Sequence, residues 1–160
     1  MDTLFYAGIV GSRRRNTFND IKIVNRLVEW LVNRQDWHER PVIVSGGCHT
    51  GADAFAESAA RAWGLNTRIY HIDKEGASNR WEFTTRAYER NRKIAETSNA
   101  IFALVSEDRT GGTENTIKHA LELKKPVFLV TTNGEVYLSP DGKMPTCDPE
   151  VRLLDLKFTG

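Results

Sequence analysis

Short apolar runs and amphipathic stretches alternate along most of the chain. Between residues 18 and 34, apolar side chains recur at three- and four-residue spacing, which predicts a helix with one buried face: Ile21, Val24, Leu27, Val28 and Leu31. The same reasoning predicts helices at 50–64, 81–97 and 113–125. Strands are predicted between them, at 4–12, 41–47, 66–72, 100–105 and 126–131.

The order strand, helix, strand, helix predicts an α/β domain with an open, mostly parallel central sheet and helices on both faces. The continuously apolar run at 100–105 is typical of a strand buried on both sides. A chain of 160 residues fits a single domain, with its core at about 4–131. Because glycine and proline are frequent after residue 131, we expect 132–160 to be an irregular extension with a small hairpin and a final strand.

Composition excludes few classes of ligand or cellular location. The 22 basic and 21 acidic side chains give a formal charge of +1, so any polyanion would have to bind a local basic patch. The two cysteines, Cys48 and Cys147, have no metal-binding or redox spacing and favour a reducing compartment, so we expect a cytoplasmic protein. No apolar run approaches the length of a membrane span, and we expect no membrane partner.

Three predicted strands end in glycines and small hydroxyl residues, at 11–13, 45–53 and 109–116. In an open α/β sheet these ends meet at one edge, where ligands bind. Glycine lets backbone N–H groups approach an anion, and the start of the following helix adds free donors and a positive dipole. Glycine-rich turns also occur simply to make the turn. Three of them in one domain favour a pocket for a phosphate or another anionic oxygen.

Four motifs carry a resemblance to a known family: GIVGSR, VIVSGGCHTGAD, RNRKIAETSNAIFALV and RTGGTENTIKHALELKKPVFLV. In this order, over about residues 5–131, they resemble the SLOG superfamily of Rossmann-like domains. That superfamily includes YspA-type domains, the DNA-processing protein DprA and the LOG phosphoribohydrolases. The resemblance implies a nucleotide or nucleotide-derived ligand in a pocket formed by the glycine-rich loops.

The resemblance also implies site residues. The positions that match its motifs are Gly11, Ser12, Arg13, Ser45, Gly46, Gly47, Gly51, Asp53, Arg90, Asn91, Gly111, Gly112 and Thr113. We add Thr50 and Thr116, whose hydroxyls are suitable donors. The turn at 45–51 is expected to present its backbone N–H groups and Thr50 to a phosphate or ribose. In the run at 13–15, we expect Arg13 to face the pocket, and Arg14 and Arg15 to be solvated.

The LOG enzymes suggest an alternative in which the N-glycosidic bond of a nucleoside monophosphate is hydrolysed. The resemblance places Arg90 at their catalytic arginine, but Thr116 stands where their catalytic glutamate is expected. Cleavage of an N-glycoside builds positive charge on the ribose, which a carboxylate stabilises and a threonine does not. Glu114 is the nearest substitute in sequence. Our leading hypothesis is therefore a sensor, carrier or sequestering module without strong catalysis, and a hydrolase using Arg90 and Glu114 is the alternative.

A second alternative is a DprA-like binder of single-stranded DNA, because 80–93 contains five basic side chains. Glu82, Glu89 and Glu96 offer partners that would make this an ordinary solvated helix, and we favour that interpretation for Arg86 and Lys93. Trp81 precedes this helix in a segment that could close over a ligand.

Three other candidate site residues also have interpretations that involve no ligand. Asp53 stands three residues after Thr50, so a helix-capping pair is as good an interpretation as recognition of a ribose hydroxyl. Cys48 and His49 lack a second ligand pair, so we predict neither a metal nor another cofactor. The apolar helices leave room for a homodimer.

Overall fold

The computed structural model describes residues 3–33, 39–144 and 152–157. Within these ranges, seven strands form one sheet in the order β3-β2-β1-β4-β5-β6-β7, and four helices cover it. The strands are β1 Thr3–Gly11, β2 Glu39–Ser45, β3 Thr67–Ile69, β4 Ala100–Leu104, β5 Val127–Val130, β6 Glu135–Leu138 and β7 Arg152–Lys157. The helices are α1 Phe18–Asn33, α2 Ala52–Trp63, α3 Arg80–Thr97 and α4 Gly112–Glu122. The α/β class predicted from the sequence is confirmed.

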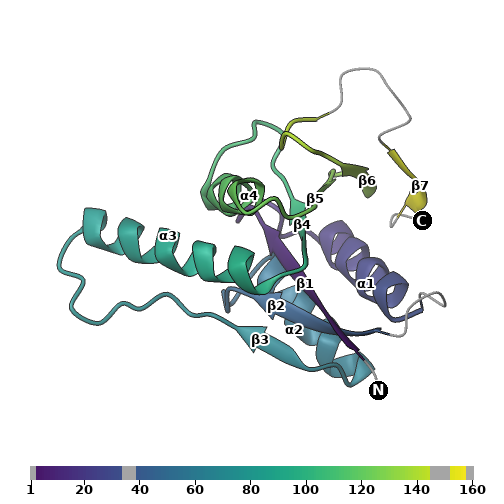
Figure 1. Cartoon of the computed structure of the whole chain (residues 1–160), viewed down its shortest axis with the longest axis horizontal. Helices are drawn as coiled ribbons and strands as arrows, with labels where there is room; N and C mark the ends of the chain where they lie inside the picture. Colours follow the sequence, from purple (N-terminus) through teal and green to yellow (C-terminus); the bar gives the residue numbers. More distant parts are fainter. Residues whose placement is uncertain (1–2, 34–38, 145–151, 158–160) are drawn as a thin grey trace.

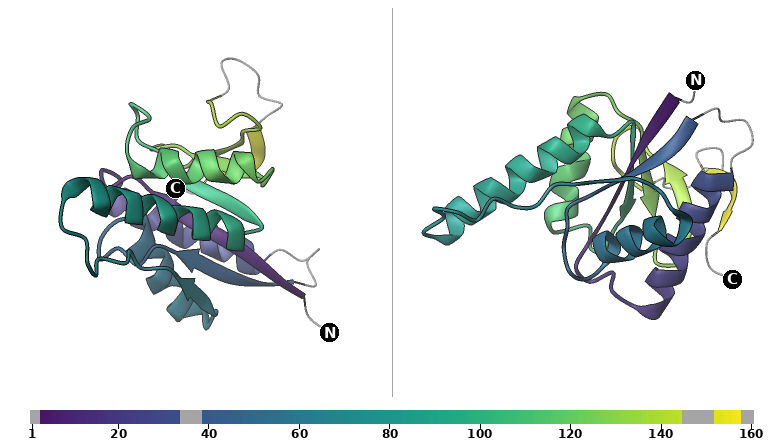
Figure 2. Two further views of the ribbon diagram at one scale, coloured as in Figure 1. Left: turned by 60° about the vertical axis from the view of Figure 1, so that its left-hand side comes forward. Right: turned by 90° about the horizontal axis from the view of Figure 1, so that it is seen from below.

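The helices form two layers, one on each face of the sheet (Figures 1 and 2). Side chains of α1 and α2 share one apolar cluster with the sheet, and side chains of α3 and α4 share the other. The position of β4 between the two clusters explains why its sequence is continuously apolar. Phe102 and Leu104 belong to the first cluster, whereas Ile101 and Ala103 belong to the second. Both faces of β4 are therefore covered, as the sequence pattern predicts.

Strands β1 to β5 are parallel, and the extension adds β6 antiparallel to β5 and β7 antiparallel to β6. The pairing of Val130 with Val136 closes the expected hairpin between β5 and β6. The final strand is present at Arg152–Lys157. Strand β3 is shorter than predicted and ends at Ile69, so His71 and Ile72 belong to the loop that leads to α3.

The order of the strands reverses at β1. From β1 the chain builds outward through β2 and β3 on one side, then crosses to β4 and β5 on the other. The loops after β1 and β4 consequently leave the sheet in opposite directions and open a crevice at their carboxyl ends. This switch point is where open α/β sheets bind ligands.

A buried arginine fixes the loops around that crevice. The expectation that Arg15 is solvated is wrong, because its exposed fraction is 2%. Its Nε donates to Asp20 at 2.8 Å, Nη1 donates to the carbonyls of Val105 and Val130 at 2.9 and 2.8 Å, and Nη2 donates to the carbonyl of Thr131 at 2.9 Å. The guanidinium thereby joins the start of α1 to the ends of β4 and β5.

Replacing Arg15 should destabilise the fold strongly. Arg15→Met would leave Asp20 buried without its cationic partner and would remove one donor from each of three carbonyls, of which those of Val130 and Thr131 keep a backbone N–H donor. This should lower the free energy of unfolding by about 3–5 kcal/mol. Urea denaturation measures the change. Arg26→Ala, an exposed change on α1, is the matched control and should change stability by less than about 0.5 kcal/mol. Equal effects of the two substitutions would contradict the assigned role of Arg15.

Candidate functional site

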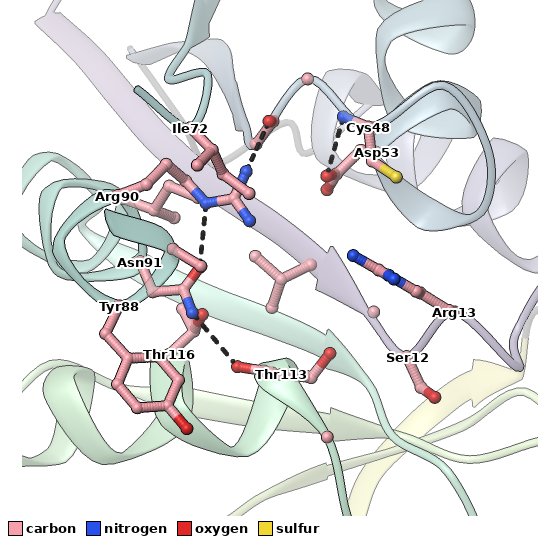
Figure 3. A pocket seen from close by; sticks show the side chains of 18 of the residues that line it. Ser12, Arg13, Cys48, Asp53, Ile72, Tyr88, Arg90, Asn91, Thr113 and Thr116 are labelled. Carbon is pink, nitrogen blue, oxygen red and sulfur yellow. Dashed lines mark hydrogen bonds between the residues drawn. The ribbon is translucent and has the colours of Figure 1, made fainter. Parts of the chain in front are cut away.

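A cleft of about 600 Å³ lies at the carboxyl edge of the sheet (Figure 3). The loops after β1, β2 and β3, the loop before α4, and one side of α3 line it. It brings together most of the residues predicted from the sequence, namely Gly11, Ser12, Arg13, Gly46, Gly47, Asp53, Arg90, Asn91, Gly111, Gly112, Thr113 and Thr116. The lining does not include Ser45, Thr50, Gly51 or Glu114.

The start of α4 faces the cleft with free hydrogen-bond donors. Gly111 is the N-cap and provides no side-chain cap, and among the described residues no acceptor bonds the N–H groups of Gly111, Gly112 and Thr113. A Cβ added at Gly111 or Gly112 would meet no heavy atom of the described residues within 4 Å, so those residues do not crowd the start of α4 at these two positions. The hydroxyls of Thr113 and Thr116 also line the cleft. Free N–H groups and the positive helix end together favour an anion.

Two arginines face each other across the cleft in Figure 3. Arg13 is exposed and forms no hydrogen bond or ion pair with any described residue. Arg90 is held in place, since Nη1 donates to the carbonyl of Gly46 at 2.6 Å and Nε donates to Oδ1 of Asn91 at 2.9 Å. Burial lowers the pKa of Arg90, while Asp53 and Cys48 oppose that shift. The guanidinium stays charged at neutral pH, and its Nη2 is left for a ligand.

The turn after β2 differs from our expectation. Three of its N–H groups are already occupied within the protein: Gly47 donates to Oγ of Ser45 at 3.2 Å, Cys48 donates to Oδ2 of Asp53 at 3.2 Å, and Gly51 donates to Oδ1 of Asn16 at 2.8 Å. Oγ of Ser45 in turn donates to Glu57 at 2.7 Å. Thr50 is exposed and lies outside the lining. This turn therefore shapes the cleft through side chains and close packing rather than through free amides.

Asp53 lines the cleft and does not cap α2. The N-cap of that helix is Gly51, which has no side-chain cap, so the capping-pair interpretation with Thr50 is not supported. Burial raises the pKa of Asp53, and the N–H groups of Cys48 and Gly46 together with the charge of Arg90 oppose the rise. A carboxylate kept in a cleft at this cost is suited to accept a hydrogen bond from a ligand hydroxyl.

Glu114 forms an ion pair with Arg109 and does not line the cleft. Its carboxylate receives two hydrogen bonds from Arg109, at 2.9 and 2.8 Å, and Nη2 of Arg109 also donates to the carbonyl of Gly142 at 2.6 Å. The pair links the start of α4 to the C-terminal extension. Among the described residues that line the cleft, Asp53 is the only carboxylate.

Arg14 connects two of the loops around the cleft. Its guanidinium donates to Asp108 at 2.5 Å, to Oγ of Ser106 at 3.2 Å, and to Oγ1 of Thr110 at 2.6 Å. These interactions hold the pKa of Asp108 well below its usual range, with the hydrogen bond from Arg14 as the largest cause. The loop that carries Gly111 and Gly112 is thus tied to the loop after β1.

Sequence reasoning missed one wall of the cleft. The loop after β3 and the first half of α3 contribute His71, Ile72, Lys74, Phe83, Ala87 and Tyr88. None of these positions belongs to a recognisable motif, and only the length of the polar loop pointed to them. Trp81 is 75% exposed and does not line the cleft. Arg92 pairs with Glu96 at 2.8 Å, as expected for a solvated helix.

Ranges 3–33, 39–144 and 152–157 hold no cluster of three or more histidine, cysteine, aspartate or glutamate side chains that could hold a metal ion. In the same ranges, no helix has the length and apolar character needed to cross a membrane.

Comparisons with known proteins show the fold. No protein-family model matches the chain, and no curated protein matches it. The chain is structurally similar to the molybdenum cofactor carrier protein MCP from Chlamydomonas reinhardtii, with a TM-score of 0.53 and 18% identity over 80% of this chain and 77% of that one. It is also similar to protein VC1899 from Vibrio cholerae, with a TM-score of 0.51 and 11% identity over 88% of this chain and 34% of that one. At these identities, the similarity establishes a Rossmann-like α/β fold.

Asp53→Asn tests whether the carboxylate of Asp53 contributes to the stability of the fold. Because the pKa of Asp53 is higher in the folded protein than in the unfolded chain, its charge opposes folding at neutral pH, and this cost disappears below the unfolded pKa of about 3.9. The variant should therefore be at least as stable as the wild type at pH 7, with the difference vanishing toward pH 3. Thermal unfolding at both pH values tests this, and a clear loss of stability at pH 7 would assign Asp53 a structural role.

Proposed function

We propose that this cleft binds a nucleotide or nucleotide-derived small molecule, and that the protein acts as a sensor, carrier or sequestering module of the SLOG type. The observation that carries the proposal is the convergence of free donors on one space. Three kinds of donor border the same cleft: the N–H groups at the start of α4, the hydroxyls of Thr113 and Thr116, and the guanidinium of Arg13, which forms no hydrogen bond or ion pair with a described residue. A phosphate oxygen is the ligand group that satisfies such a set.

The charge of the cleft supports an anionic ligand. Arg13, Lys74 and Arg90 line it, whereas Asp53 is the only acidic lining residue in the described part of the chain. Arg14 also lines the cleft, but Asp108 already compensates its charge. The charged lining residues outside the Arg14–Asp108 pair therefore carry a net positive charge, in a protein whose formal charge is only +1. Fixed positive charge in a cleft attracts anionic ligands and raises their local concentration.

The arrangement of polar groups favours a nucleotide over a bare phosphate. Asp53 lies beside Cys48, across the cleft from Thr113 (Figure 3), and Ile72 and Phe83 line the same cleft. A carboxylate at that position accepts hydrogen bonds from sugar hydroxyls, and apolar and aromatic side chains pack against a planar base. A cleft of about 600 Å³ is within the usual size range for such ligands. The structural neighbour from Chlamydomonas reinhardtii is itself described as a carrier protein.

Binding without cleavage has the stronger support. Glu114, the carboxylate considered for hydrolysis, is paired with Arg109 outside the lining, and Thr116 supplies only a hydroxyl. Binding of single-stranded DNA along α3 has little support, because Arg86 pairs with Asp73 and Arg92 pairs with Glu96. We therefore expect a ligand to be recovered intact.

Gly112→Val should abolish binding while preserving the fold. The added side chain has open space at this position but would occupy the place of the anion, so affinity should fall by at least about 100-fold, the equivalent of losing two hydrogen bonds to a charged group. Mass spectrometry of denatured, freshly purified protein identifies a retained small molecule, and calorimetry with that molecule gives the affinity.

Lys118→Val is the matched control, since it places the same side chain on an exposed position of α4. Unchanged affinity in Gly112→Val, with thermal unfolding like that of the wild type, would contradict the proposed anion site. Release of free base from a bound nucleotide would show that the protein is a hydrolase and that Asp53, rather than Glu114, deserves testing as its carboxylate.

A further inference from the structure

We propose that Arg90 and Asp53 together form a subsite for the sugar hydroxyls of the ligand, so that the cleft selects ribonucleotides over nucleotides whose sugar lacks a hydroxyl. The inference rests on the proposed function, because it places the phosphate of the nucleotide at the start of α4. It concerns two side chains of opposite charge that line the cleft beside the turn after β2 (Figure 3).

Gly46 lets these two side chains lie close together. Nη1 of Arg90 lies 2.5 Å, and Oδ2 of Asp53 lies 2.9 Å, from the place that a Cβ on Gly46 would occupy. The guanidinium and the carboxylate are therefore neighbours, although one comes from α3 and the other from α2. Both residues belong to the described part of the chain, and they nevertheless form no ion pair, since no nitrogen of Arg90 lies within 4.0 Å of a carboxylate oxygen of Asp53.

The backbone of the turn holds each charged group separately. Nη1 of Arg90 donates to the carbonyl of Gly46 at 2.6 Å, and Oδ2 of Asp53 accepts from the N–H of Cys48 at 3.2 Å. Nη2 of Arg90 donates to no described residue, and a carboxylate that accepts one or two backbone N–H groups keeps free acceptor sites. A free donor and a free acceptor thus lie side by side in the cleft.

Such a pair selects an uncharged group that both accepts and donates. A phosphate at this place would be repelled by Asp53, and an ammonium group would be repelled by Arg90. A hydroxyl suits both, because its oxygen accepts from the guanidinium while its hydrogen is donated to the carboxylate. At hydrogen-bond lengths of about 2.9 and 2.7 Å, the two partners of one hydroxyl are about 4–5 Å apart, which fits neighbours that are too far apart for an ion pair.

Hydrogen bonds connect this pair to the start of α4. Nε of Arg90 donates to Oδ1 of Asn91 at 2.9 Å, and Nδ2 of Asn91 donates to the carbonyl of Gly112 at 3.4 Å. One side chain therefore separates the guanidinium from the residue whose N–H faces the anion. In a nucleotide the sugar follows the phosphate directly, and the base lies beyond it. An anion at Gly112 consequently brings the sugar, rather than the base, to Arg90 and Asp53.

The test compares ligands that differ only in their sugar hydroxyls. Adenosine and guanosine 5′-monophosphates and their 2′-deoxy and 3′-deoxy forms are titrated calorimetrically into the wild type. For at least one base, removal of one hydroxyl or the other should weaken binding about tenfold or more, as expected for a lost hydrogen bond to a charged group. The ratio of the two affinities is the measured quantity.

Asp53→Ala should reduce this ratio to about one, since the acceptor is lost. Asp53→Asn should leave a ratio of about three, because a hydrogen bond to a neutral amide is roughly half as strong as one to a carboxylate. The ratio is more informative than either affinity alone, because removal of the negative charge also reduces the repulsion of the phosphate and affects every ligand in the series alike.

Gly46→Ala tests the geometry without removing either charged group. The added Cβ would displace the ends of two flexible side chains, those of Arg90 and Asp53, so the fold should be kept while the ratio falls to about one. Thermal unfolding of the variant checks that the fold is kept.

Glu89→Ala is the matched control, because Glu89 is an exposed carboxylate of α3 outside the cleft lining, and it should retain the wild-type ratio. Equal affinity for all three sugars, or a ratio that survives Asp53→Ala or Gly46→Ala, would overturn the subsite. In these cases, nucleotide binding that Gly112→Val abolishes would leave the proposed function standing. If none of the nucleotides binds, the proposed function fails together with this inference.

Discussion

The buried guanidinium of Arg15 is the constraint on which the cleft depends. It lies beneath the loops at the carboxyl edge and satisfies the carbonyls of Val105, Val130 and Thr131 together with the carboxylate of Asp20. A buried charge is tolerated only when its donors are used, so each of these groups has one position relative to the others. The ends of β4 and β5 and the start of α1 are therefore fixed together, and the binding loops extend from fixed points.

Three consecutive arginines have different roles at the carboxyl edge of the sheet. Arg15 fixes the ends of β4 and β5, Arg14 ties the loop after β4 to the loop after β1 through Asp108, and Arg13 forms no hydrogen bond or ion pair with a described residue. One short segment thus supplies a structural ion pair, a link between loops and a charge for a ligand.

The sequence predicted the fold because its signals are local and repeated. The apolar run of β4, the spacing of Val24 and Leu27 on α1, and the glycines after each strand follow rules that tertiary contacts did not override. The burial of Arg15 was not predictable, since a run of arginines has the same pattern whether it is solvated or paired with carbonyls 90 and 115 residues away. The wall containing Lys74 was missed for a similar reason, because it depends on Arg86 holding a loop that has no motif.

The two glycine-rich turns look alike in sequence but differ physically. At Gly46 an added Cβ would lie 2.5 Å from Nη1 of Arg90, so this glycine is needed for close packing, and the neighbouring N–H groups already have protein acceptors. At Gly112 the same Cβ would meet nothing within 4 Å, and in the described part of the chain the N–H groups of Gly111, Gly112 and Thr113 have no acceptor. Donors left free in the folded protein must be satisfied by water or by a ligand. An anion that replaces water at the start of α4 gains the helix dipole and the charge of Arg13, whereas an anion at the turn after β2 would first have to displace Asp53. Hydrogen-bond satisfaction, rather than glycine content, therefore distinguishes the loop that can bind a phosphate from the loop that shapes the cleft.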